Sequence, residues 1–193
     1  MRPRINPSVL SFALAAIVLS LGATPLLAAE AYSIDGAHSF VVFRVNHLGI
    51  SDSYGRFNEM SGEFQVDGQT PKSLSFQINA ESVDSANEDR DKHLRSPDFF
   101  NVKQFPVIKF ASKSIEKHGD HFEVTGDLTM LGVTKTVTFE ARHTGEGKDP
   151  WGNYRSGWHG EFTVKRSDFG MNFMLEGIGD EVAVVVAVEG IKK

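Results

Sequence analysis

Residues 39–47, SFVVFRVNH, carry the pattern that decides the fold. Side chains two positions apart lie on the same side of an extended chain. One side of this segment holds Val41, Phe43, Val45 and His47. The other side is mixed and carries Arg44 and Asn46 together with Val42. This alternation predicts a β-strand that buries one of its faces.

The same alternation recurs along the chain. Apolar residues repeat at every second position within residues 74–78, 108–112, 124–128, 137–141, 162–164 and 182–188. Turn residues separate the runs, at Asp67-Gly68, His118-Gly119-Asp120, Leu131-Gly132 and Asp149-Pro150-Trp151-Gly152. Eight or nine strands with short connections predict an all-β fold, an antiparallel sandwich or barrel. Because no internal repeat or linker divides the chain, we expect one domain over residues 30–193.

One charged segment, EDRDKHLRSPDFF at residues 88–100, interrupts the strand pattern and can form a helix. Residues 85–88, SANE, match a capping box, which satisfies the first free N–H groups of a helix. Pro97 cannot continue a helix and therefore ends it. We expect one short crossover helix near residues 86–95.

The side chains of this segment predict a structural role. Asp91 and Arg95 are four positions apart, the spacing of a surface ion pair on a helix. The aromatic residues that follow need an apolar surface to bury against. Leu94, Phe99 and Phe100 are therefore expected to dock on the body of the fold as a lid.

The N-terminal residues have the order of a secretory signal peptide. Arg2 and Arg4 give a positive start, and the apolar run at residues 9–23 is too short to cross a bilayer comfortably. We expect residues 1–29 to be removed, with cleavage after Ala29 or Ala31. The mature chain is then exported and has no membrane span.

Composition excludes several functions. The formal net charge is −5, and removal of the signal arginines makes it more negative. An acidic chain lacks the basic stripe that nucleic-acid phosphates require, so no nucleic-acid partner is expected. The chain has no cysteine, which excludes disulfides, thiol catalysis and cysteine metal ligands.

The chain has 15 phenylalanines, and many fall on the inward phase of the expected strands. Small residues such as Ser112, Gly126 and Ala141 are interleaved with them. A barrel of about eight strands can hold one small ligand or be filled by its own side chains. The alternation of large and small residues fits either interior, a hollow tube or a packed taper.

Short motifs follow one another in a characteristic order. They are HLG (47–49), GRF (55–57), RDKHLRSPDF (90–99), GDLT (126–129), GVTK (132–135), DPWG (149–152), DFG (168–170) and GDEV (179–182). In this order they resemble the YceI-like family of bacterial periplasmic proteins, from Tyr32 to near the C-terminus.

The resemblance implies an antiparallel, lipocalin-like β-barrel of about eight strands with an apolar pocket. The implied ligand is a long amphiphilic lipid, a polyisoprenoid or an isoprenoid quinone. The implied role is that of a periplasmic carrier, linked to transport or stress, without a catalytic residue, a metal or a cofactor other than bound lipid. Together with the inward strand phase, it predicts a pocket lined by Val41, Phe43, Val45, His47, Phe76, Phe110, Phe139 and Phe162.

Other functions stay open from the sequence. An enzyme acting on a lipid or its head group would use His47, His93 or Asp98. A filled barrel would instead be a structural or stress-response interaction module. His118 and His121 flank a solvated turn without a third ligand, so no metal site is expected. A homodimer through strand edges or the barrel mouth also stays open.

Overall fold

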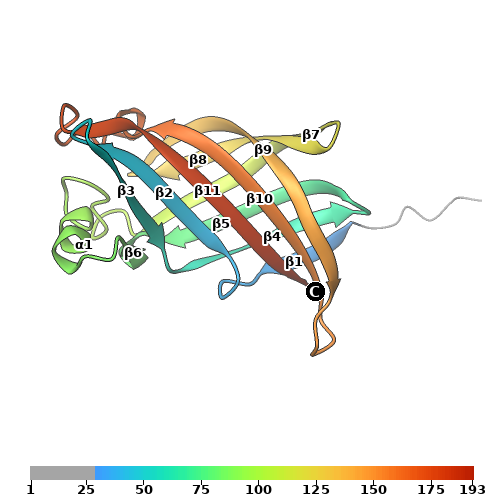
Figure 1. Cartoon of the computed structure of the whole chain (residues 1–193). Helices are drawn as coiled ribbons and strands as arrows, with labels where there is room; N and C mark the ends of the chain where they lie inside the picture. The colour runs from blue at the N-terminus through green and yellow to red at the C-terminus, as the bar shows by residue number, and fades with distance from the viewer. Residues whose placement is uncertain (1–28) are drawn as a thin grey trace, which may run out of the picture.

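A computed structural model describes residues 29–193, whose strands form one antiparallel sheet that closes into a barrel (Figure 1). The expected signal peptide therefore lies, apart from Ala29, outside the described residues. The strands are β1 (Glu30–Ile34), β2 (Phe40–His47), β3 (Ser51–Phe57), β4 (Met60–Asp67), β5 (Thr70–Asn79), β6 (Val83–Asp84), β7 (Val107–His118), β8 (His121–Met130), β9 (Val133–Lys148), β10 (Tyr154–Lys165) and β11 (Ile178–Lys192). Two 3₁₀ turns, η1 (Ala80–Ser82) and η2 (Arg166–Phe169), and one α-helix, α1 (Glu88–Leu94), complete the fold.

The barrel has eight strand positions, because each of the first three positions holds two consecutive strands that together form one bent strand. β1 pairs with the end of β11 at residues 190–192, whereas β2 pairs with β11 at residues 178–187. In the next position, β4 pairs with β1 and β3 pairs with β2. In the third, β5 pairs with β4 and β6 pairs with β3. The expected antiparallel barrel of about eight strands with one short crossover helix is confirmed.

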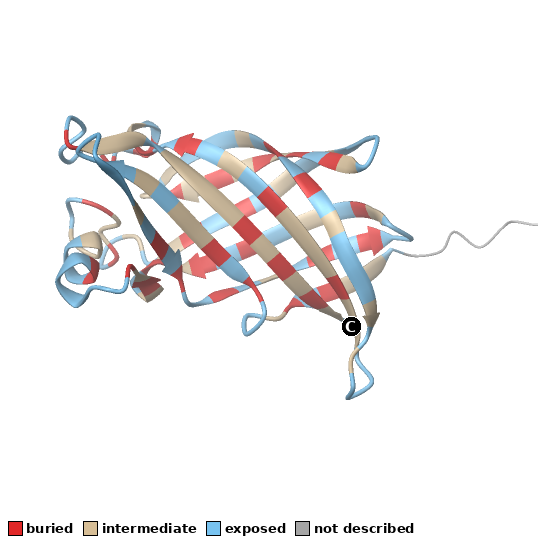
Figure 2. Ribbon diagram, viewed as in Figure 1, coloured by how far each residue is buried: buried red, intermediate tan, exposed pale blue. Residues whose placement is uncertain are grey.

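The inward faces of the strands form the core. Figure 2 shows buried and exposed residues alternating along the strands. On β8 every even position is buried, and the odd positions are half-buried or exposed. At the end of the barrel that holds the C-terminus, aromatic rings fill the interior. The ring pairs are Tyr32 with Phe64, Phe76 with Phe110, and Phe110 with Phe139, with centroids 5.0, 5.2 and 5.5 Å apart. This half of the barrel is a packed core.

The helix begins later than the capping box predicted. Asn87 is the N-cap, and its side chain accepts a hydrogen bond from the backbone N–H of Arg90. The backbone N–H and the hydroxyl of Ser85 both donate to the carboxylate of Asp91 instead. The predicted capping box is therefore wrong, because the Ser85 side chain is already engaged by a residue one turn into the helix.

The predicted surface pair between Asp91 and Arg95 is also wrong. Asp91 is only 7% exposed and turns toward Ser85. Arg95 donates to the carbonyl oxygens of Glu81 and Val83, each at 2.8 Å. These two bonds tie the end of α1 to η1 and β6, so the charges of the helix fasten it to the barrel.

None of the helices in residues 29–193 combines the length and the apolar character needed to cross a bilayer.

Candidate functional site

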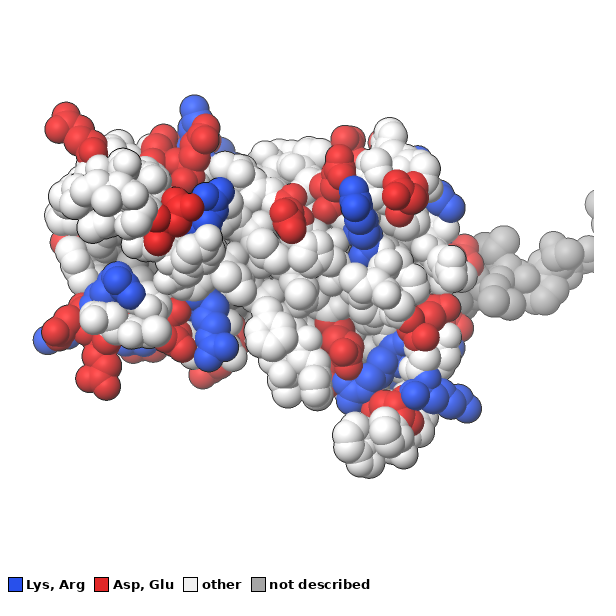
Figure 3. All heavy atoms as spheres, in the orientation of Figure 1, with Lys and Arg blue, Asp and Glu red and all other residues white. Residues whose placement is uncertain are grey.

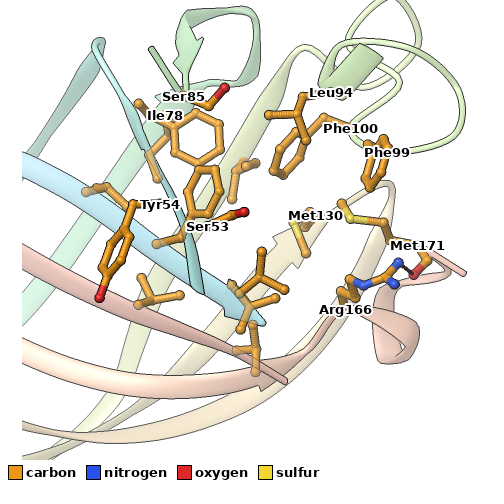
Figure 4. Close-up of a pocket in the computed structure, with 18 of the residues that line it drawn as sticks. Ser53, Tyr54, Ile78, Ser85, Leu94, Phe99, Phe100, Met130, Arg166 and Met171 are labelled. Carbon is orange, nitrogen blue, oxygen red and sulfur yellow. Dashed lines mark hydrogen bonds between the residues drawn. The ribbon is translucent and has the colours of Figure 1, made fainter. Parts of the chain in front are cut away.

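A cavity of about 480 Å³ lies inside the end of the barrel that α1 covers (Figure 4). Side chains from most strand positions, from η2 and from the segment around α1 line it. Its volume lies within the range of about 300–1,000 Å³ that is typical of small-molecule sites. The barrel is therefore hollow at one end and filled at the other.

The wall of the cavity is mostly aliphatic. The inward positions of β11 contribute Val182, Val184 and Val186. The other strands add the apolar residues Val41, Val45, Ile78, Ile108, Leu128 and Met130. Such side chains offer a ligand no hydrogen bonds. They can hold it only by shape and by the apolar area that is removed from water.

The floor of the cavity is formed by two phenylalanines. Phe76 and Phe162 line it, and each is stacked on a second ring in the filled end of the barrel. Phe76 stacks on Phe110 with centroids 5.2 Å apart, and Phe162 stacks on Phe139 with centroids 5.1 Å apart. Phe110 and Phe139 thus lie one layer below the cavity, outside its lining, contrary to the expected pocket. The other six expected residues, Val41, Phe43, Val45, His47, Phe76 and Phe162, line the cavity.

The lid closes the cavity with three apolar side chains. Leu94, Phe99 and Phe100 all line it, as Figure 4 shows. The Phe100 ring lies edge-on to Phe57, with centroids 5.2 Å apart, and 6.4 Å from Phe43. Phe100 is thus wedged against β2 and β3 from inside the barrel.

The polar groups at the base of the lid are satisfied by one another. Arg90 donates from Nε to the hydroxyl of Ser85 at 2.7 Å and from Nη2 to the Ser85 carbonyl at 2.6 Å. The same hydroxyl donates to Asp91. Although Ser85 and Arg90 line the cavity, the Ser85 hydroxyl already donates its one proton within the protein.

The remaining polar side chains of the lining lie toward the mouth. They are His47 and Ser53 on β2 and β3, and Asp89 and His93 on α1. Tyr54 also borders the cavity, but it lies opposite Arg44 on the outward phase of β3 and is 59% exposed. His93 is paired with Asp98, with Nε2 and Oδ2 2.8 Å apart. A ligand with an apolar tail in the cavity would therefore place its polar end at this mouth.

One buried cation, Arg166, belongs to the cavity wall. Only 3% of it is exposed, and it donates to the carbonyl oxygens of Met171, Ile178 and Gly179 at 2.9, 2.7 and 2.9 Å. Burial lowers its pKa, and the nearby carboxylate of Asp180 opposes that shift. Arg166 therefore clamps the segment between β10 and β11, which forms part of the cavity rim.

Two groups of possible metal ligands lie away from the cavity. His118 and His121 are stacked at the turn between β7 and β8. Asp35, His38 and Glu189 lie within metal-binding distance of one another in the described part of the chain. Both carboxylates of that group accept hydrogen bonds from Arg155. The guanidinium of Arg155 thus supplies the positive charge that explains why these acidic side chains lie together.

Sequence reasoning missed much of the cavity wall. Leu128, Met130, Val182 and Val184 continue period-two runs that the sequence displays, so their inward phase was available as a signal. Arg166 had no such signal, because a charged residue beside a turn is usually exposed.

A family model described as the YceI-like domain matches residues 32–190. A Pseudomonas aeruginosa protein named UPF0312 protein is 44% identical over 183 residues, covering 91% of this chain and 96% of that protein. Protein YceI of Salmonella arizonae is 43% identical over 193 residues, covering 98% of this chain and 100% of that protein.

Solved structures with the same fold include BcnA of Burkholderia cenocepacia, with a TM-score of 0.73 and 23% identity over 81% of this chain and 98% of that one. A structure from Saccharophagus degradans, described as a polyisoprenoid binding domain, has a TM-score of 0.66 and 16% identity. It covers 84% of this chain and 98% of the other. At these identities the likeness concerns the fold.

Proposed function

This chain belongs to the YceI-like domain family, and from that premise we propose that it binds a long amphiphilic lipid in its barrel. The lipid is a polyisoprenoid or an isoprenoid quinone. Its apolar tail occupies the cavity above Phe76 and Phe162, and its polar end lies at the mouth near His47 and Ser53.

The observation that carries the proposal is the contrast between the cavity wall and its mouth. The wall is mostly aliphatic, the floor is aromatic, and the unengaged polar side chains gather at the mouth. Each buried methylene group contributes about 0.8 kcal/mol, so a chain segment of roughly ten such groups gains about 8 kcal/mol before ordering costs. Shape and apolar area can therefore retain a lipid without any catalytic group. The fold shared with a polyisoprenoid binding domain supports the same ligand class.

The role we propose is that of a carrier rather than an enzyme. An enzyme would rely on His47, His93 and Asp98, and a histidine–carboxylate pair needs a third reacting group. The Ser85 hydroxyl in the cavity lining already donates to Asp91 and accepts from Arg90. The His93–Asp98 pair is accounted for by contacts that hold the lid, since the His93 ring also packs edge-on against Phe99.

The location we propose is the periplasm. It rests on the expected signal peptide at residues 1–29 and on the family resemblance. A periplasmic carrier would shield the tail of the lipid from water between membranes. A role in stress follows from the same resemblance.

The test is the identification of a bound molecule. The protein is exported with its own N-terminus, purified without detergent, and examined by native mass spectrometry and by organic extraction. We expect a mass adduct that extraction removes and identifies as a long isoprenoid lipid. A protein that is consistently empty and takes up neither a polyprenol nor a long-chain isoprenoid quinone would overturn the proposal.

A further inference from the structure

Five large apolar side chains stand exposed on two neighbouring loops at the cavity end of the barrel. We name them the rim patch: Leu48, Ile50, Phe173, Met174 and Leu175. Ile50 is 81% exposed and Met174 is 51% exposed. Exposed apolar side chains that are gathered in one place usually mark a surface that contacts something apolar.

The two loops form one surface. The backbone N–H of Leu48, after β2, donates to the carbonyl of Gly177, before β11, at 2.7 Å. The side chains of Leu48 and Met174 converge on Gly177, where an added Cβ would lie 3.2 Å from Leu48 Cδ2 and 2.5 Å from Met174 Cε. The rim patch is therefore continuous across both loops.

The rim patch is also continuous with the cavity. His47 and Ile178 are paired across β2 and β11, and both line the cavity. Phe173 packs against the lid residues His93 and Phe99, with centroids 5.2 and 5.4 Å apart. A molecule on the rim patch would thus lie directly beside residues of the cavity wall and of the lid.

The backbone of both loops is held in an unfavourable conformation. Leu48 and Met174 have φ angles of 57° and 50°, in the left-handed region that favours glycine. Hydrogen bonds keep the Met174 turn in place, because Gly177 and Ile178 both donate to the Met174 carbonyl. Strain of this kind persists where the surrounding structure imposes it and is common at functional sites.

We propose that the rim patch docks the mouth of the barrel on a lipid bilayer. The apolar side chains enter the outer part of the leaflet, so that the ligand passes between leaflet and cavity without crossing water. This inference rests on the proposed function, since a lipid tail is the cargo that needs a dry path. The partner that we propose for the rim patch is a lipid bilayer and not a second copy of the chain.

The charges of the molecule indicate which bilayer suits it. Figure 3 shows an uncharged area at the cavity end, bordered by acidic and basic groups. Glu176 lies exposed within the second loop, and the chain is acidic overall. Docking should therefore depend on apolar insertion and gain nothing from anionic lipid, unlike the docking of basic surfaces.

The experiment measures flotation of the purified protein with phosphatidylcholine vesicles. The test variant carries Ile50→Asp and Leu175→Asp, two exposed positions in the rim patch. The control is Trp151→Asp, which changes an apolar residue about as exposed as Ile50, in the turn between β9 and β10 at the other end of the barrel (Figure 1). We expect vesicle binding to fall about tenfold in the test variant and to stay unchanged in the control. Adding phosphatidylglycerol should not strengthen the binding.

Other results would overturn the inference. These are unchanged vesicle binding in the test variant, an equal loss in the control, or a wild-type protein that does not float. Loss of a concentration-dependent dimer in the test variant, seen by sedimentation velocity, would assign the rim patch to a second copy. Native mass spectrometry of the same samples measures separately whether the cavity holds lipid. A lipid-filled protein that ignores vesicles refutes docking and leaves the proposed function standing, whereas an empty protein refutes the proposed function itself.

Discussion

The ring of Phe110 on β7 lies across Gly126 on β8, so closely that a Cβ on Gly126 would fall 2.4 Å from Phe110 Cζ. The same relationship recurs between Phe64 and Gly190 and between Phe139 and Gly160. Each glycine leaves the space that an inward ring on another strand occupies, as in aromatic rescue of strand glycines. The small residues at these positions therefore pack the barrel and do not hollow it.

Substitution of Gly126 by alanine should destabilise the protein. The new Cβ would meet the Phe110 ring and also the Ala111 carbonyl oxygen at 2.5 Å. Overpacking of this kind costs about 1–3 kcal/mol, and we expect about 2 kcal/mol from urea unfolding. Gly147→Ala is the control, because nothing lies within 4 Å of a Cβ there. Equal stability of the two variants would contradict the ring-on-glycine packing.

Filling the cavity should displace the ligand without unfolding the protein. Val184→Phe adds a ring that points into the cavity, where there is free volume. We expect the lipid-bound fraction, measured by native mass spectrometry, to fall about tenfold, equivalent to about 1.4 kcal/mol of binding free energy. The matched control is Val185→Phe, one residue along β11 and outside the cavity lining. A lipid-bound fraction that falls equally in both variants would argue against this site.

Loosening the lid should accelerate loss of the ligand. Phe100→Ala removes the edge-on contacts with Phe57 and Phe43. Aromatic pairs contribute about 0.5–1.5 kcal/mol each, so loss of both contacts removes about 1–3 kcal/mol. We expect lipid transfer to acceptor vesicles to become about fivefold to a hundredfold faster. Phe40→Ala, on an exposed ring at the start of β2, serves as the control. If both variants release lipid at the wild-type rate, the aromatic wedge does not retain the ligand.

The acid stability of the protein should depend on Arg155. Its hydrogen bond to Asp35, with a second from His38, lowers the Asp35 pKa to about 2. At Asp149, burial raises the pKa, but hydrogen bonds from Arg155 and Asn153 outweigh it and lower the pKa overall. A carboxylate with a lowered folded pKa stabilises the protein above its unfolded pKa, which is about 3.9. That stability is lost as the pH falls from about 4 to about 2.

Arg155→Gln should therefore reduce the free energy of unfolding at neutral pH. It should also flatten the fall in stability between about pH 4 and pH 2, since the folded pKa values rise toward the unfolded ones. Urea unfolding at a series of pH values measures both effects. Arg142→Gln is the control, because Arg142 forms a 3.7 Å pair with Glu140 in which both side chains are more than 60% exposed, and such pairs contribute little. An unchanged pH profile for Arg155→Gln would show that the cluster does not carry acid stability.

The strands and the crossover helix could be predicted because their signals are local. Period-two alternation marks the buried face of each strand, and Pro97 marks where the helix cannot continue. The cap of α1 could not be predicted, because Ser85 and Asn87 both have cap-forming side chains. Asn87 caps the helix because Asp91 is buried against Ser85 and accepts the hydrogen bonds that Ser85 donates.

The sequence predicted which residues of the candidate site face inward, but not how deep in the barrel each of them lies. Phe76 and Phe110 have the same inward phase and stack on each other, yet only Phe76 lines the cavity. A residue's phase follows from the backbone of its own strand. Its height in the barrel depends on the bends in the first three strand positions and on the register between strands.

The sequence by itself determined which residues face inward, where the chain turns, and that one charged segment with an aromatic end crosses the barrel as a helix. Only the tertiary structure decided that the barrel is filled at one end and hollow beneath α1. The physical reason is that an inward side chain meets a ring, a glycine or a void according to its partners on neighbouring strands. Those partners are distant in sequence, and their alignment is set when the sheet closes.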